Sequence, residues 1–214
     1  MTETNPVAII GGGLAGLTAA VRVARAGVPV TVFEKARALG GRAQTETRSG
    51  FQFNLGPHAL YTKGAAARTL RELGIAFSGR VPQLSGGYAL ESGAAQTLPM
   101  GFVSMLTTGL LGLPAKLETA KLFSLFGKLD ARALQDVSLR EWLDQTLQQP
   151  QTRRVAKAFL QLSTYANDAE RQSAGAAIAQ LQMGLDGGVL YLDGGWQTLV
   201  DKLRAAAEQA GARF

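Results

Sequence analysis

Two tight groups of glycines flank a single amphipathic segment near the N-terminus, in VAIIGGGLAGLTAAVRVARAGVPVTVFEKARALGGRA, residues 7–43. Glycine destabilises regular structure, by about 1 kcal/mol per residue inside a helix. A chain that concentrates glycine in this way must bring its backbone close to something that a side chain would keep away. This requirement constrains the fold more than any other feature of the sequence.

The first glycine group lies between an expected strand and an expected helix. Residues 7–10 form a short apolar run, which is typical of a strand buried on both faces. The glycines that follow form the pattern G-x-G-x-x-G: Gly11, Gly13 and Gly16. Apolar residues then recur at helical spacing as far as Gly27, which stands where a helix C-cap belongs. The segment therefore predicts a strand, a tight turn and a helix in succession.

A second strand and an acidic residue complete the unit. The apolar run 30–33 ends at Glu34, about twenty residues after the turn, as in a dinucleotide-binding unit. In such units the turn and the helix N-terminus hold the pyrophosphate, and the acid accepts the ribose hydroxyls. Glu34 would repel the 2′-phosphate of NADP. We therefore expect a nucleotide site that includes Leu14 and Ala15 together with the glycines.

The second glycine group favours FAD over NAD. Gly40 and Gly41 follow Glu34 after a short loop, and Arg42 comes directly after them. A glycine pair lets a second loop close over the pyrophosphate, and an arginine adds a charge-assisted contact to a phosphate. A simple NAD-binding half has no use for this second loop, whereas the longer FAD molecule does. The alternative interpretation is a surface turn with a solvated arginine.

Three segments resemble the N-terminal signature of flavin amine oxidases, phytoene desaturases and protoporphyrinogen oxidases: IIGGGLAGLTAA, VFEKARALGGRA and FNLGPHAL. The resemblance implies FAD as the cofactor, with its adenosine on Glu34 and its phosphates on the first glycine turn and Arg42. Many relatives carry an arginine two residues after the acid, where this chain has Ala36. Arg37 is the candidate substitute for that contact.

The third segment implies where the flavin ring lies. The alternating residues 45–53 predict a β-hairpin, and Asn54, after them, stands where relatives often carry aspartate. The resemblance places the next residues against the isoalloxazine ring: Gly56, Pro57, His58, Ala59 and Leu60. His58 is the only histidine in the sequence and the one candidate for a catalytic role. The alternative for His58 is a hydrogen-bonded loop residue.

Beyond this loop the sequence predicts a mostly helical region. A helix is expected at 64–73, a second hairpin within 86–99 with Ser92 and Gly93 at its turn, and a helix behind the capping box of Ser138 and Glu141. Further helices are expected after Pro150 and within 168–183. Gly194 and Gly195 open the last helix, and a strand should begin at Phe214.

We therefore expect an α/β fold, a doubly wound (Rossmann-type) FAD-binding domain with an inserted, mostly helical substrate domain. The FAD-binding domain would comprise residues 1–79 and 191–214, with the substrate-domain segment in 80–190. Family members are longer than this chain, so we expect the C-terminal part of the sheet and the last flavin-binding loop to be missing.

An uncharged stretch runs from Gly93 to Ala115, bounded by Pro99 and Pro114. Its apolar part is shorter than the ~20 residues that a spanning helix needs, so we expect a buried or interfacial segment. Its apolar residues and those just beyond line a substrate tunnel or form ordinary core: Leu106, Leu110, Leu113, Leu117, Phe123 and Phe126.

Composition limits the remaining possibilities. The chain has no cysteine, which excludes disulfides and thiolate zinc sites and fits a reducing compartment. We expect no metal site. The net charge is +6, but the 22 lysines and arginines are scattered, so nucleic-acid binding is not expected. An anionic ligand or an acidic membrane surface fits better. The first ten residues have no basic stretch and only a short apolar run, so we expect no secretory signal and a cytoplasmic protein with peripheral membrane contact.

The function expected from the resemblance is that of an FAD-dependent oxidoreductase, which removes hydride from a C–H or C–N bond of an apolar small molecule. Polyene, porphyrinogen and amine substrates remain open. The alternative is a non-catalytic FAD-binding fragment, because half of the flavin site would be absent. Such a fragment would expose apolar surface and self-associate.

Overall fold

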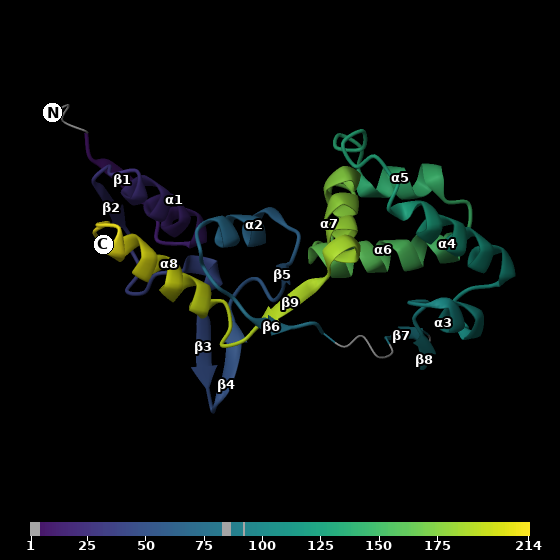
Figure 1. Ribbon diagram of the computed structural model, residues 1–214. Coiled ribbons are helices and arrows are strands. Elements are labelled where there is room, and N and C mark those ends of the chain that lie inside the picture. The colour runs from purple at the N-terminus through teal and green to yellow at the C-terminus, as the bar shows by residue number, and fades with distance from the viewer. Residues whose placement is uncertain (1–4, 83–86, 92) are drawn as a thin grey trace. The chain divides into compact units, whose positions relative to one another are not determined.

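The computed structural model describes residues 5–82, 87–91 and 93–214. The chain forms two compact units, residues 1–82 with 187–214 and residues 83–186 (Figure 1). The domain limits at 79/80 and 190/191 expected from the sequence stay a prediction.

A parallel strand pair with a crossover helix begins the first unit. Its elements are β1 (Val7–Ile10), α1 (Leu14–Arg25) and β2 (Val30–Phe33). Val7 lies beside Val30 and Ile10 beside Phe33. The last helix, α8 (Gln197–Gln209), packs along α1 (Figure 1). After α8 the chain reaches the sheet, where Arg213 forms a parallel bridge with Thr31. The predicted Rossmann-type α/β unit is confirmed. Arg213 takes the strand position beside β2, one residue before Phe214, where the sequence predicts that a strand begins.

The rest of the first unit is built from short strands and one helix. Its elements are the 3-10 turn η1 (Gly41–Ala43), the hairpin β3 (Thr45–Arg48) and β4 (Phe51–Asn54), the small antiparallel sheet β5 (Leu60–Tyr61), β9 (Val189–Leu192) and β6 (Gly79–Arg80), and α2 (Ala65–Glu72). Leucines and alanines of α1, α2 and α8 form one core with Val30 and Val32 of β2. This core packs against α1, the helix that begins at the first glycine group.

The second unit is a hairpin followed by helices. Its elements are β7 (Tyr88–Glu91), β8 (Ala94–Thr97), α3 (Phe102–Thr107), α4 (Leu113–Phe126), α5 (Leu139–Thr146), α6 (Pro150–Thr164) and α7 (Ala174–Gly187). Ser92, expected at the hairpin turn, lies outside the described residues. The helix expected within 168–183 begins only at Ala174, because Ser173 precedes it as a cap whose Oγ accepts the N–H of Ala176 (3.2 Å).

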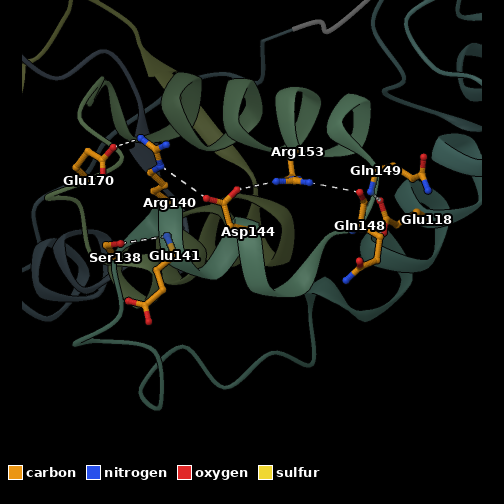
Figure 2. A network of polar contacts seen from close by, with 9 residues as sticks. All are labelled: Glu118, Ser138, Arg140, Glu141, Asp144, Gln148, Gln149, Arg153 and Glu170. Atoms are coloured by element: carbon orange, nitrogen blue, oxygen red, sulfur yellow. Dashed lines mark hydrogen bonds and ion pairs between the residues drawn. The ribbon is translucent and has the colours of Figure 1, made fainter.

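Polar contacts join α4, α5 and α6 (Figure 2). The Oγ of Ser138 accepts the N–H of Glu141 (3.1 Å), as the capping box predicts. At the start of α6, the Glu118 carboxylate accepts the N–H groups of Gln148 (2.7 Å) and Gln149 (3.0 Å). Gln149 is the N-cap of α6 and Gln148 precedes it, so Glu118 binds the backbone at the entry to the helix and places its negative charge near the helix N-terminus.

Several apolar side chains in and just after the uncharged stretch 93–115 are more exposed than the sequence suggests. Leu110 and Phe126 are buried, but Leu106, Leu113 and Leu117 are mostly exposed. The expectation of ordinary core is wrong for these three, because helical spacing shows which residues share a face but not whether that face is covered. Among the described residues, no helix is long and apolar enough to cross a membrane.

Candidate cofactor site

The two glycine groups lie against each other. The N–H of Gly40 donates to the carbonyl of Gly12 (2.7 Å), and Gly13 forms a parallel bridge with Gly40. A Cβ on Gly41 would lie 3.9 Å from the Cα of Gly13. Segments separated in the sequence by a helix and a strand therefore meet backbone to backbone and form one site.

Gly16 sets the start of α1 tightly on the turn. A Cβ at this position would lie 1.9 Å from the carbonyl oxygen of Gly11, which no rearrangement of a side chain could relieve. Gly11 itself has a φ of +102°, in the region that favours glycine. The last glycine of the pattern thus permits close helix packing, and the first permits the turn.

The start of α1 is open to an anion. Gly13 is the N-cap, and within the described residues no side chain caps this helix. The first-turn N–H groups have no partner inside the helix, and the helix dipole adds partial positive charge there. Leu14 is half-buried and Ala15 is exposed. A Cβ on Gly13 would meet only the Gly40 carbonyl, at 3.8 Å, so the space beside the two loops can receive a pyrophosphate.

Glu34 lies beside this turn with both carboxylate oxygens engaged. Its Oε1 accepts the N–H of Ala36 (2.9 Å) and its Oε2 accepts the N–H of Gly12 (2.8 Å). These two N–H groups, that of Ala36 first, hold the pKa of Glu34 below its usual value. Glu34 is therefore ionised at neutral pH, and each oxygen keeps acceptor capacity for a ribose hydroxyl.

Sequence reasoning missed the role of Gly12. A Cβ there would lie 2.3 Å from the Cδ2 of Leu39, so this position is closed to a side chain unless Leu39 moves. The uninterrupted run Gly11, Gly12 and Gly13 was the available signal, since the G-x-G-x-x-G pattern leaves the middle residue open.

Arg42 and the third segment lie next to each other. A Cβ on Gly56 would lie 2.4 Å from the carbonyl oxygen of Arg42, so the two backbones are in contact. The Arg42 side chain is exposed, and its guanidinium has no hydrogen bond or ion pair to the part of the chain that the structure describes. It is available to an external anion. Arg37, the candidate substitute, is also exposed.

The residues expected along the flavin ring differ in accessibility. Gly56, Pro57 and Ala59 are half-buried and His58 is exposed. Leu60 is 1% exposed, lies in the core and pairs with Leu190, so only its backbone can face a ligand. The contacts of these residues with the flavin, and a catalytic role for His58, stay predictions.

A hairpin–helix clamp supports the second glycine group. Thr45 Oγ1 donates to Asn54 Oδ1 (2.7 Å), which also accepts the N–H of Trp196 (3.1 Å). Thr45 Oγ1 in turn accepts the N–H of Gln197 (3.1 Å). The hairpin thus caps α8, and α8 lies behind the loop, since a Cβ on Gly40 would be 3.1 Å from Val200. Sequence reasoning noted Asn54 only as a departure from relatives.

Metal ligands do not gather in the described residues, which contain no group of three His, Cys, Asp or Glu side chains that could hold an ion. The candidate site is therefore built from backbone N–H groups, one carboxylate and one guanidinium. This set matches the adenosine and pyrophosphate of a dinucleotide.

Comparison with known proteins supports this interpretation. The chain is similar to a phytoene desaturase from Cercospora nicotianae, 45% identical over 74 residues, which are 34% of this chain and 12% of that protein. It resembles a solved putrescine oxidase (TM-score 0.71, 23% identity, 97% of this chain and 50% of that one). It also resembles an oxidoreductase from Methanosarcina mazei (TM-score 0.72, 21% identity, 98% of this chain and 50% of that one).

The solved structures show the fold, and the chain spans about half of their length. The match to the family described as flavin-containing amine oxidoreductases is more extensive, because it covers residues 14–214. The chain therefore belongs to the flavin-containing amine oxidoreductase family, with FAD as its cofactor.

Proposed function

We propose that this chain supplies the adenosine and pyrophosphate half of the FAD site in an oxidoreductase of the amine oxidase or desaturase type. The observation that carries the proposal is the backbone contact between the two glycine groups beside Glu34. Glu34 would hold the ribose hydroxyls. The N-terminus of α1 and Arg42 would hold the phosphates.

When bound, FAD supplies a hydride acceptor at its N5 atom. The role of the protein residues is to position the cofactor and to exclude water. Residues 56–60 are the candidates for contact with the ring. Their first residue, Gly56, contacts the backbone of Arg42. His58 is the one candidate among them for a proton transfer, since its side chain is exposed on this loop.

The substrate class that we favour is an apolar small molecule that loses hydride from a C–H or C–N bond. Support comes from the similarity to a phytoene desaturase, an enzyme named for a polyene substrate. The similarity to a putrescine oxidase would favour an amine substrate instead. At 23% identity, however, this similarity is evidence for the fold and not for the substrate.

A second candidate function is FAD binding without turnover. It is favoured by the described site, because its carboxylate and its guanidinium suit the adenosine and the pyrophosphate rather than the reacting ring. The two functions separate in one experiment on the purified chain: titration with FAD, NAD and NADPH, followed by anaerobic addition of an amine, a porphyrinogen or a polyene.

Binding of FAD followed by bleaching of its absorbance with one donor would support the oxidoreductase. Binding without bleaching by any donor would support the binding module. Tight binding of NADPH with no binding of FAD would overturn both candidates, because Glu34 should exclude the 2′-phosphate.

A further inference from the structure

The second unit carries an exposed apolar surface that belongs neither to its core nor to the cofactor site. Its residues are Phe102, Val103, Leu106, Leu113 and Leu117, and we call it the α3–α4 surface. Their exposed fractions range from 59% for Leu106 to 80% for Phe102. Scattered exposed leucines are ordinary, but apolar residues gathered on one surface mark an interaction site.

The five side chains come from two helices that contact each other. On α3, Phe102, Val103 and Leu106 share a helix face, and on α4, Leu113 and Leu117 lie one turn apart. The Nζ of Lys116 donates to the carbonyl of Leu106 (2.6 Å). Because Lys116 lies one turn from Leu113 on α4, this bond holds the start of α4 beside the end of α3. Figure 1 shows α3 and α4 as neighbouring helices.

Lysines predominate among the charges that follow this surface in the sequence. Residues 93–115 carry no charge, and the next charged residues are Lys116, Glu118 and Lys121. The Glu118 carboxylate is engaged with the backbone of Gln148 and Gln149 (Figure 2). Lys121 is exposed one turn beyond Leu117. Two lysines, and one glutamate whose carboxylate is engaged with the start of α6, therefore border the apolar surface.

We propose that the α3–α4 surface binds the headgroup region of an anionic lipid bilayer. Apolar side chains enter the boundary between headgroups and acyl chains, while lysines extend their ammonium groups to the lipid phosphates. The six residues of α3 are far too few to span a bilayer, so the contact is interfacial. Charge complementarity selects this occupant over a neutral apolar partner.

The proposal goes beyond the proposed function and does not rest on it. Access to an apolar substrate would give membrane contact a use, but lipid binding is measured without FAD and without substrate. A failure of FAD binding would leave this proposal standing, and a failure of lipid binding would leave the oxidoreductase standing.

The test is cosedimentation of the purified chain with vesicles of phosphatidylcholine alone or mixed equally with phosphatidylglycerol. We expect binding to the anionic vesicles, little to the neutral ones, and weakening by salt. Leu106→Asp and Leu117→Asp should each lower partitioning about tenfold or more, because each removes a leucine from the interface. Lys121→Glu should lower binding to the anionic vesicles.

Matched controls lie elsewhere on the same unit. Leu162 lies on α6 and is 65% exposed. It is about three helical turns beyond Gln151, whose side-chain oxygen accepts the N–H of Gly112 next to the α3–α4 surface. Leu162→Asp should keep vesicle binding. Lys157→Glu, on α6, changes the net charge by the same amount as Lys121→Glu on α4. This variant should also keep most of the vesicle binding. Circular dichroism of each variant checks that it is folded.

Three results would overturn the proposal. The first is absence of binding to anionic vesicles by the folded wild-type chain. The second is equal loss of binding in the control and surface variants. The third is a wild-type oligomer that ignores vesicles and that Leu106→Asp converts to a monomer, since the surface would then bind a second copy of the chain.

Discussion

At the scale of single residues, the site depends on groups that act through hydrogen bonds to the backbone. Glu34 is the clearest case, because the turn proposed to hold the pyrophosphate donates to the carboxylate proposed to hold the ribose (Gly12 N to Glu34 Oε2, 2.8 Å). One side chain therefore contacts the first glycine turn and would present acceptors to the ligand. Its pKa is lowered by the N–H groups of Ala36 and Gly12, so it does both while ionised.

Replacement of Glu34 tests this double role. Glu34→Ala should weaken FAD binding about tenfold or more, because it removes the carboxylate that would accept the ribose hydroxyls. It should not create useful NADPH binding, because no cation takes the place of the acid. Isothermal titration with both nucleotides measures this. Glu46→Ala, on the exposed hairpin, is the control and should leave the FAD affinity unchanged.

Asn54 should contribute to stability through the start of α8. Asn54→Ala removes the acceptor of the Thr45 hydroxyl and of the Trp196 N–H, and should lower the free energy of unfolding by about 1–2 kcal/mol. Asn54→Asp keeps the acceptor and adds a negative charge at a helix N-terminus, so it should be at least as stable as the wild type. Thermal unfolding measures the stability of both variants, with Gln52→Ala on the same strand as the control. Equal stability of Asn54→Ala and Gln52→Ala would contradict the clamp.

At the scale of elements, helix starts are satisfied by partners that are distant in sequence. The start of α6 receives the carboxylate of Glu118 from α4, and the start of α8 receives the hairpin. The start of α1 has no such side chain among the described residues. Within the same described residues the start of α2 has none either, so the contact of α1 with the second glycine group, rather than the missing cap, is what marks α1 as the candidate ligand-binding helix.

The cap at α6 predicts a pH dependence of stability. Burial raises the pKa of Glu118, but the N–H groups of Gln148 and Gln149, with Thr152 and Arg153, lower it by more in total. Its contribution is therefore fully present above the pKa of the unfolded chain and is lost as the pH falls through the lower folded value.

Glu118→Gln should lower the free energy of unfolding by about 1 kcal/mol at neutral pH, a value typical of a helix cap. The difference from the wild type should shrink below about pH 4, as the wild-type carboxylate becomes protonated. Denaturant unfolding across this range measures it. A surface pair offers the control, Glu208→Gln on α8, which should change stability less. A wild-type advantage that grows in acid would refute the assignment.

At the scale of the whole molecule, local patterns were sufficient for the α/β unit. The spacing of Gly11, Gly13 and Gly16 reports backbone contacts made within a few residues, so strand, turn and helix were predictable. The clamp of Asn54 on Trp196 joins residues 142 positions apart and leaves no local pattern. The exposure of Leu106 and Leu117 was equally hidden, because it depends on what other elements leave uncovered.

The central claim is that the two glycine groups form one FAD half-site, and Gly13→Val tests it most directly. The backbone of Gly13 is extended, and a Cβ there meets only the Gly40 carbonyl at 3.8 Å, so the variant should fold. Its side chain would occupy the space for the pyrophosphate. Titration with FAD should then show a dissociation constant raised more than tenfold, a loss above about 1.4 kcal/mol. Gly127→Val, at a position with open space, should bind as the wild type does. An unchanged dissociation constant in a folded Gly13→Val protein would contradict the account.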